Sequence, residues 1–192
     1  DRGYSAIRMG AKVKDKINSK NPSIVDYAVS ELRTDSNDIF LGSHCRFFLC
    51  SDCGISVIPE MSRVPTVYVN WTLLLRISTW VINGLFIFKK FYKKEDNRFL
   101  SFSEILALDF GGPDTINIFT KLGLELIENT PEEIRAVTIE MDERIKGTWK
   151  PSPEDNELQN QFWSLFGPEK LKSPNLRIGA EFLRQNKELL WQ

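Results

Sequence analysis

The sequence predicts an α/β domain built on a Rossmann-like, doubly wound, mainly parallel sheet with a helical carboxyl-terminal extension. Two observations lead to this prediction. In the first two thirds of the chain, short apolar runs alternate with stretches of helical character, and such alternation forms parallel sheets through right-handed crossovers. From about Ser101 onward, helix start and stop signals dominate. We therefore expect a Rossmann-like domain over residues 1–128 and a helical extension packed on it over residues 129–192.

The strands of the first part are predicted from short apolar runs. Three of these runs are continuous and rich in β-branched and aromatic residues, which is typical of strands buried on both faces. The expected elements are strands or apolar runs at residues 5–9, 24–25, 46–50, 65–69 and 85–88, and a charged helix at residues 12–18 with Val13 and Ile17 on one face.

Helices of the second part are predicted from their caps. Thr130 is a helix-capping residue, Pro131 suits a first turn, and Glu133 completes a capping box. Gly147 is placed to end this helix. A second helix is expected to open at Ser152, and a last one to cover residues 178–190.

Composition excludes several classes of function. The formal net charge is −1, from 25 basic and 26 acidic residues, so no overall field attracts nucleic acid or an anionic membrane. The basic run at residues 89–94 is followed by Glu95 and Asp96, which favours a solvated loop. No apolar run reaches the ~20 residues of a membrane-spanning helix. Three clustered cysteines, an odd number, argue against a secreted disulfide scaffold, so a cytoplasmic location is expected.

Motif searches exclude further classes. The chain has a single histidine and no G-x-S-x-G segment, so a Ser-His-Asp hydrolase is not supported. It also lacks the G-x-x-x-x-G-K-S/T phosphate loop and the G-x-G-x-x-G dinucleotide fingerprint.

The segment that points to chemistry covers residues 46–71: a strand, a tight turn with Gly54, a helix and a second strand. A glycine lets a phosphate approach the backbone, and the free amides at a helix start favour an anion. Ligands of doubly wound sheets lie beyond the carboxyl ends of the strands. The alternative is a plain strand-to-helix connection whose polar residues only cap the helix.

The cysteines allow two other interpretations. Cys50 and Cys53 form a C-x-x-C at the turn, as in thioredoxin-like proteins, and Pro65 precedes a strand. In that fold, however, a helix and another strand separate the two features. A zinc site could use His44, Cys45, Cys50 and Cys53. A strand between Cys45 and Cys50 would span about 13 Å, too far for ligands of one metal; we therefore expect no metal site.

A resemblance to a known family carries the argument further. The S-D-C-G turn, the helix and the V-P-T-V strand resemble the donor-binding domain of GT-B glycosyltransferases, which implies that residues 1–128 form a donor nucleotide-binding domain. The chain is more closely similar to a family of bacterial glycosyltransferases found with surface-polysaccharide genes. The shared motifs run through nearly the whole chain and are R-M-G at residues 8–10, the turn at residues 47–56, P-T-V-x-x-N-W at residues 65–71, S-F-x-E-I at residues 101–105, and the helix at residues 132–141.

The resemblance implies a set of binding residues. The turn would hold the donor diphosphate, Arg8 beside Gly10 could pair with a phosphate, Glu60 could bind a ribose, and Asn70 and Trp71 could touch the base or sugar. Arg8, Glu60 and Trp71 also have purely structural alternatives: a surface arginine, a solvated helix residue and a packing residue. The implied set is Arg8, Gly10, Ser51, Asp52, Cys53, Gly54, Ile55, Ser56, Glu60, Asn70 and Trp71. Cys53 replaces the usual serine of the motif, which matters little if its backbone makes the contact.

The expected function is therefore transfer of a sugar from a nucleotide diphosphate donor to a saccharide acceptor in surface-polysaccharide synthesis. No further cofactor is expected, and no catalytic base is assigned. In inverting GT-B enzymes the base comes from an amino-terminal domain, which we expect as a missing partner, so that the chain alone would be an inactive fragment. The alternative is a non-catalytic Rossmann-like interaction or scaffold module. Donor base, sugar, acceptor, stereochemistry and oligomeric state are left open.

Overall fold

The computed structural model describes residues 2–77, 81–108, 119, 121–167 and 176–191. Its centre is a four-stranded parallel sheet in the order β3-β4-β5-β9, which confirms a mixed α/β fold with a parallel sheet and is compatible with a Rossmann-like arrangement. The four strands are β3 (Phe48–Cys50), β4 (Thr66–Trp71), β5 (Gly84–Phe88) and β9 (Leu176–Ile178).

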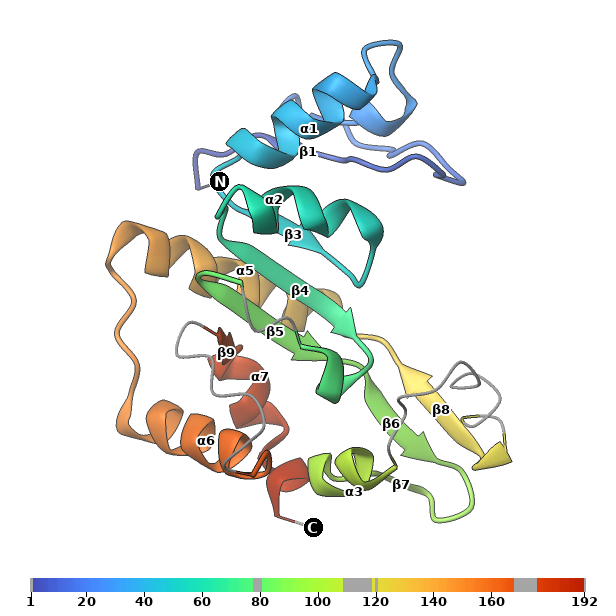
Figure 1. Ribbon diagram of the computed structural model, residues 1–192, viewed down its shortest axis with the longest axis vertical. Helices are drawn as coiled ribbons and strands as arrows, with labels where there is room; N and C mark the ends of the chain where they lie inside the picture. The colour runs from blue at the N-terminus through green and yellow to red at the C-terminus, as the bar shows by residue number, and fades with distance from the viewer. Residues whose placement is uncertain (1, 78–80, 109–118, 120, 168–175, 192) are drawn as a thin grey trace.

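Two smaller sheets flank this centre (Figure 1). At the top of the view, a short parallel pair lies close to the first helix. At the lower right, an antiparallel sheet has the order β7-β6-β8. The strands are β1 (Ala6–Ile7), β2 (Ile24–Val25), β6 (Lys90–Lys93), β7 (Arg98–Phe99) and β8 (Leu124–Ile127).

Helices surround the central sheet. α5 packs across β4 and β5, and α7 packs against both α5 and α6. The α-helices are α1 (Asp35–His44), α2 (Val57–Met61), α3 (Phe102–Ala107), α5 (Pro131–Lys146), α6 (Pro153–Ser164) and α7 (Ala180–Gln185), and the 3-10 turns are η1 (Tyr27–Val29), η2 (Gly54–Ser56), η3 (Leu74–Arg76) and η4 (Lys187–Leu190). None of the described helices is long and apolar enough to cross a bilayer.

The predicted caps of the long helices are confirmed. The hydroxyl of Thr130 accepts a hydrogen bond from the amide of Glu133, whose carboxylate accepts one from the Thr130 amide. Ser152 and Asp155 form the same reciprocal pair at the start of α6. Gly147 ends α5 in the left-handed conformation, with φ 71°, which a glycine adopts without strain.

The core lies where β4 and β5 meet α5, α6 and α7. Side chains of both central strands are completely buried, among them Val67, Tyr68, Phe86 and Ile87. A close approach at the β9–α7 junction requires a glycine. A Cβ at Gly179 would lie only 2.9 Å from the Ile87 side chain.

Four sequence predictions are wrong in detail. Residues 12–18 form no helix, because backbone groups there bond elsewhere: Arg8 donates to the carbonyl of Asp15, and Ile17 donates to Asp26. β3 is not buried on both faces, since Leu49 on this edge strand is 42% exposed.

The other two errors concern missed strands. The basic run at residues 89–94 is not a loop but contains β6, whose Phe91 is buried in the core while Lys90 and Lys93 are partly buried and paired with carboxylates. The predicted helix at residues 178–190 begins too early, because Ile178 belongs to β9 and pairs with Phe86. β9 therefore joins the predicted extension to the central sheet, while the domain boundary near residue 128 stays a prediction.

Candidate functional site

The predicted phosphate turn lies at the carboxyl edge of the central sheet. β3 ends at Cys50, which is aligned with Tyr68 of the neighbouring strand, and the chain then passes through Ser51, Asp52 and Cys53 into η2 and α2. Ser51, Asp52 and Gly54 are exposed to solvent. The turn thus has the place that parallel α/β sheets give to their ligands.

Backbone amides lie close to Cys53 at the turn. Cys53 is extended, with φ −150° and ψ 151°, the amide of Ser56 donates to its carbonyl at 3.1 Å, and the amides of Ser56 and Ile55 stabilise its thiolate. A Cβ on Gly54 would meet nothing within 4 Å. The turn therefore combines open space with a local concentration of N–H donors.

This concentration of donors changes the acidity of two cysteines. A hydrogen bond from Cys50, together with the amides of Ser56 and Ile55, lowers the pKa of Cys53 to about 6 against the effect of burial. The same Cys50–Cys53 hydrogen bond, followed by burial, raises the pKa of Cys50 well above its usual range. The turn therefore favours negative charge at the position of the Cys53 sulfur. All three cysteines are free thiols.

We expect Cys53 to react with iodoacetamide before Cys45 and Cys50, because burial raises the pKa of Cys45 as well. The rate at Cys53 should show a midpoint near the pKa of about 6. Fragment mass spectrometry of the peptide after Arg46 separates the two turn cysteines. Cys53→Ser should remove the fast reaction, and midpoints of about 8–9 at every cysteine would contradict the geometry.

The carboxylate of Glu60, the predicted ribose ligand, already has a hydrogen-bond partner within the chain. Its carboxylate accepts a hydrogen bond from the hydroxyl of Tyr68, a side chain of β4 that is otherwise buried. Burial, followed by the hydrogen bond and charge of Glu60, raises the pKa of Tyr68 well above its usual range. The charge of Glu60 also contributes to the raised pKa of Cys50, so this carboxylate lies near the turn.

Asn70 and Trp71 at the end of β4 are held by contacts within the chain. Asn70 has φ 53° and forms a reciprocal pair with Asn129, in which each backbone amide donates to the other side-chain oxygen at 2.6 Å. Trp71 is 5% exposed, and its indole N–H donates to the carbonyl of Leu73 at 2.8 Å. Its ring also packs edge-on against Tyr68 and Phe86.

Arg8 uses all three guanidinium nitrogens near the amino terminus. Nε and Nη2 bind the two oxygens of Asp26 at 2.7 and 2.8 Å, and Nη1 donates to the carbonyl of Asp15 at 2.9 Å. The Ile17 amide and then Arg8 lower the pKa of Asp26. Gly10 follows with φ 146°, a conformation open to glycine. Arg8 therefore forms a bidentate ion pair with Asp26, a carboxylate of its own segment.

The structure thus brings the turn, Glu60, Asn70 and Trp71 to one edge of the sheet, and it leaves Arg8 and Gly10 in the two-stranded sheet segment. Sequence reasoning missed Tyr68 and Asn129 as partners of this edge. Asn129 directly precedes the cap of α5, and only the capping signal at Thr130 marks its neighbourhood in the sequence.

Neither metal ligands among the described residues nor matches to known proteins help to identify this site. Across the described residues, no cluster of three or more His, Cys, Asp or Glu side chains is arranged to hold a metal ion. Comparisons of the chain with family models, with curated proteins and with solved structures find no match.

Proposed function

We propose that this chain is the nucleotide-sugar-binding domain of a GT-B type glycosyltransferase, acting in surface-polysaccharide synthesis. The observation that carries the proposal is the exposed turn after β3, where a hydrogen bond from Cys50 and then the amides of Ser56 and Ile55 favour negative charge and lower the pKa of Cys53 to about 6. A donor diphosphate is an anion of the kind that such amides bind. The parts of the proposal that concern the sugar and its transfer rest on the motif resemblance.

In the proposed complex the diphosphate lies over Gly54, where the backbone leaves space, and it accepts hydrogen bonds from the turn amides. A thiolate at Cys53 competes for the same donors. A saccharide acceptor and a second domain would complete the cleft, as in other two-domain transferases, and the catalytic base is left unassigned. Binding without turnover is therefore expected of the chain alone.

The first test is a thermal-shift panel with UDP, GDP, ADP and CMP. A diphosphate at ten times its Kd should raise Tm by roughly 3–6 °C in a domain of this size. Gly54→Trp is the blocked control, since the backbone at Gly54 has room for a side chain and no positive φ. Loss of the shift in that variant, at unchanged stability, supports the proposed site.

Cys53→Ser sharpens the same test. Removing the thiolate at pH 8 takes one negative charge away from the phosphate position, which should strengthen diphosphate binding about fivefold. At pH 5, below the pKa of about 6, wild type and variant should bind alike. A pH-independent difference would mean that the diphosphate does not share the donors of Cys53.

A second candidate function is a non-catalytic interaction module with the same fold. The observation in its favour is that Arg8, Glu60 and Asn70 already have partners within the chain. A module of this kind needs no nucleotide. No shift with any of the four nucleotides at millimolar concentration would favour it over the transferase domain.

A further inference from the structure

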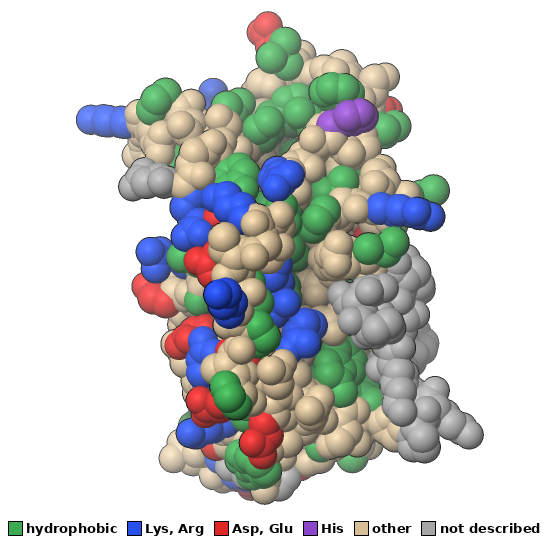
Figure 2. All heavy atoms as spheres, turned by 90° about the vertical axis from the view of Figure 1, so that its left-hand side faces the viewer, with side chains coloured by type: hydrophobic (Ala, Val, Ile, Leu, Met, Phe, Trp, Pro, Cys, Tyr) green, Lys and Arg blue, Asp and Glu red, His purple; other side chains and the backbone are tan. Residues whose placement is uncertain are grey.

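A second site lies at the opposite edge of the central sheet, where β5 and β9 begin. The end of α5 and the segment after it close over this edge and leave a pocket of about 430 Å³, a size typical of small-molecule sites. Several basic side chains gather across the middle of the face shown in Figure 2, which looks at this side of the molecule. The pocket is lined by Asn83, Gly84, Leu85, Met141, Arg144, Ile145, Trp149, Pro151 and Arg177.

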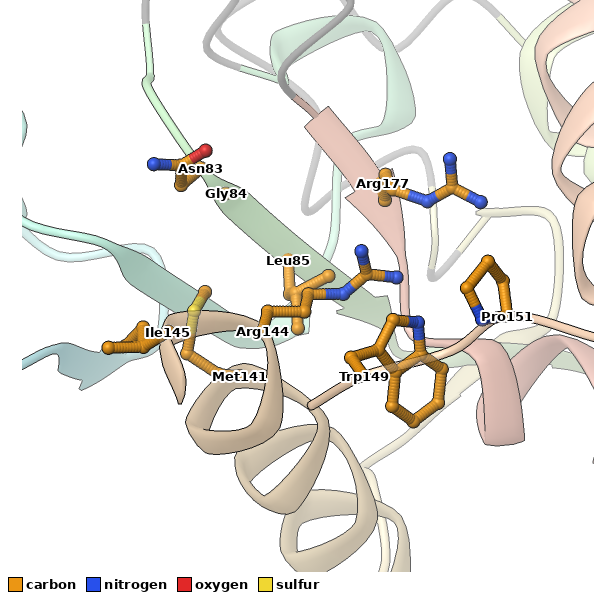
Figure 3. A pocket seen from close by; sticks show the side chains of 9 residues that line it. All are labelled: Asn83, Gly84, Leu85, Met141, Arg144, Ile145, Trp149, Pro151 and Arg177. Carbon is orange, nitrogen blue, oxygen red and sulfur yellow. The ribbon is translucent and has the colours of Figure 1, made fainter. Parts of the chain in front are cut away.

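Two buried donors in this pocket are unused. Nε of Arg177 and the indole Nε1 of Trp149 are shielded from solvent, and neither has a hydrogen-bond partner among the described residues. Figure 3 shows both side chains and Arg144 around one space, with Pro151 at its side. Buried donors of native proteins are nearly always satisfied, so two of them in one pocket call for an acceptor.

The charges of the pocket also favour an anion. Burial and then the charge of Arg144 lower the pKa of Arg177, which means that the two guanidinium groups oppose each other. Arg144 lies over the Trp149 ring, 5.1 Å from its centroid, and binds Glu140 through Nε and Nη2 at 2.9 and 2.6 Å. Among the described residues, the hydrogen-bond partner of Arg177 is the neutral side chain of Asn156, at 3.4 Å.

The carboxylate of Glu140 offsets the charges of both Arg144, which it binds, and Arg177. Glu140 is 2% exposed and spends its second oxygen on the amide of Ala180 at 2.7 Å. Asp155, the other carboxylate that acts on Arg177, is paired with Arg184. A bound oxyanion would neutralise the repulsion between Arg144 and Arg177, and a guanidinium binds such a group with two parallel hydrogen bonds.

Most of the remaining lining is apolar. Leu85, Met141, Ile145 and Pro151 line the cavity together with the ring of Trp149, and Asn83 adds one polar side chain. We propose that this pocket binds a small organic anion, a phosphate or carboxylate joined to an apolar body, through Arg177, Arg144 and the indole N–H of Trp149. The inference goes beyond the proposed donor site, because it uses other residues at the other edge of the sheet.

Three probes test the ligand chemistry on the full chain at constant ionic strength: phenyl phosphate, benzoate and inorganic phosphate. Isothermal titration should show an organic anion binding about tenfold more tightly than inorganic phosphate, because the ring buries apolar surface. Phenyl phosphate above benzoate identifies a phosphate ligand, and the reverse order a carboxylate. The absence of binding by both organic probes at 10 mM, roughly the weak end of specific affinity, overturns the proposal.

Variants locate the site. Arg177→Gln should weaken the better probe about tenfold, and Trp149→Phe, which keeps the ring and removes the donor, about threefold. The control is Arg135→Gln, which removes a charge from an exposed position of α5, the helix that carries Arg144, and should change binding less than about twofold. Equal affinities of wild type and Arg177→Gln would overturn the assignment.

Two further measurements keep the test decisive. In wild type, the indole N–H resonance that disappears in Trp149→Phe should move during the titration, and a resonance that stays fixed would overturn the proposal even if Arg177→Gln failed to fold. Gly54→Trp should bind the anion as wild type does. Loss of nucleotide binding with retained anion binding in that variant separates this site from the proposed donor turn.

Discussion

Replacing Phe162 with alanine is expected to lower the free energy of unfolding by about 3–5 kcal/mol, the range found for buried Phe→Ala changes. Natural domains have only about 5–15 kcal/mol in total. In a domain of this size the loss corresponds to a fall in Tm of roughly 6–20 °C. Chemical denaturation followed by tryptophan fluorescence measures it directly.

The expected size follows from what the Phe162 ring holds together. The side chain is completely buried and stacks on Phe88 of β5 with centroids 5.6 Å apart and an interplanar angle of 17°. It also meets Phe102 of α3 edge-on at 5.2 Å and Phe166 at 5.3 Å. Truncation therefore opens a cavity between the central sheet and two helices, and aromatic pairs lose contacts beyond simple burial.

Two controls separate cavity formation from a general effect of losing a phenylalanine. Phe40 is 57% exposed on α1, and Phe40→Ala should change stability by less than about 1 kcal/mol. Phe162→Leu keeps most of the apolar volume and should cost less than Phe162→Ala. Similar losses for Phe40→Ala and Phe162→Ala would mean that this aromatic cluster does not hold α6 on the sheet.

The segment that could be predicted best from sequence is the one where local signals and burial agree. Residues 65–69 and 85–88 are apolar on both faces because β4 and β5 are the central strands of the sheet. Thr130 and Ser152 mark their helices through caps that need only neighbouring residues. Neither kind of signal depends on distant parts of the chain.

The misses depend on distant partners. β9 has three residues, and Ile178 becomes a strand residue only because it pairs with Phe86, 92 positions earlier. Similarly, Lys90 and Lys93 of β6 look like parts of a loop until β8 pairs with them. The charge of Lys93 is balanced locally by Asp96, but that of Lys90 is balanced by Glu133, 43 positions later, and such a distant pair cannot be read from the local pattern.

The candidate site shows the same division. The turn after β3 could be predicted from Gly54 and its flanking strands. The partners of Arg8, Glu60 and Asn70 could not be predicted. Asp26, Tyr68 and Asn129 come within hydrogen-bond distance of them only once the chain has folded. Sequence reasoning therefore located the edge of the sheet but could not tell which polar side chains are already engaged there.

Asn129→Ala is the second change with a large expected effect, about 2–4 kcal/mol of stability, since it leaves two backbone groups unpaired. The Asn129 side chain is 7% exposed. Its oxygen accepts from the amide of Asn70 at 2.6 Å, and its nitrogen donates to the carbonyl of Phe88 at 2.8 Å. One side chain thus joins the ends of β4 and β5 to the start of α5. Thermal and urea denaturation would measure the loss.

The control for this change is Asn160→Ala at an exposed position of α6, which should stay within about 0.5 kcal/mol of wild type. Asn70 itself offers a finer comparison. Because its φ is 53°, Asn70→Gly should cost less than Asn70→Ala, although both lose the oxygen that accepts from the Asn129 amide. If Asn70→Gly abolished a nucleotide-induced shift without lowering stability, Asn70 would be a ligand-binding residue. If it lowered stability and kept the shift, the pair with Asn129 would be the reason for an asparagine at this edge.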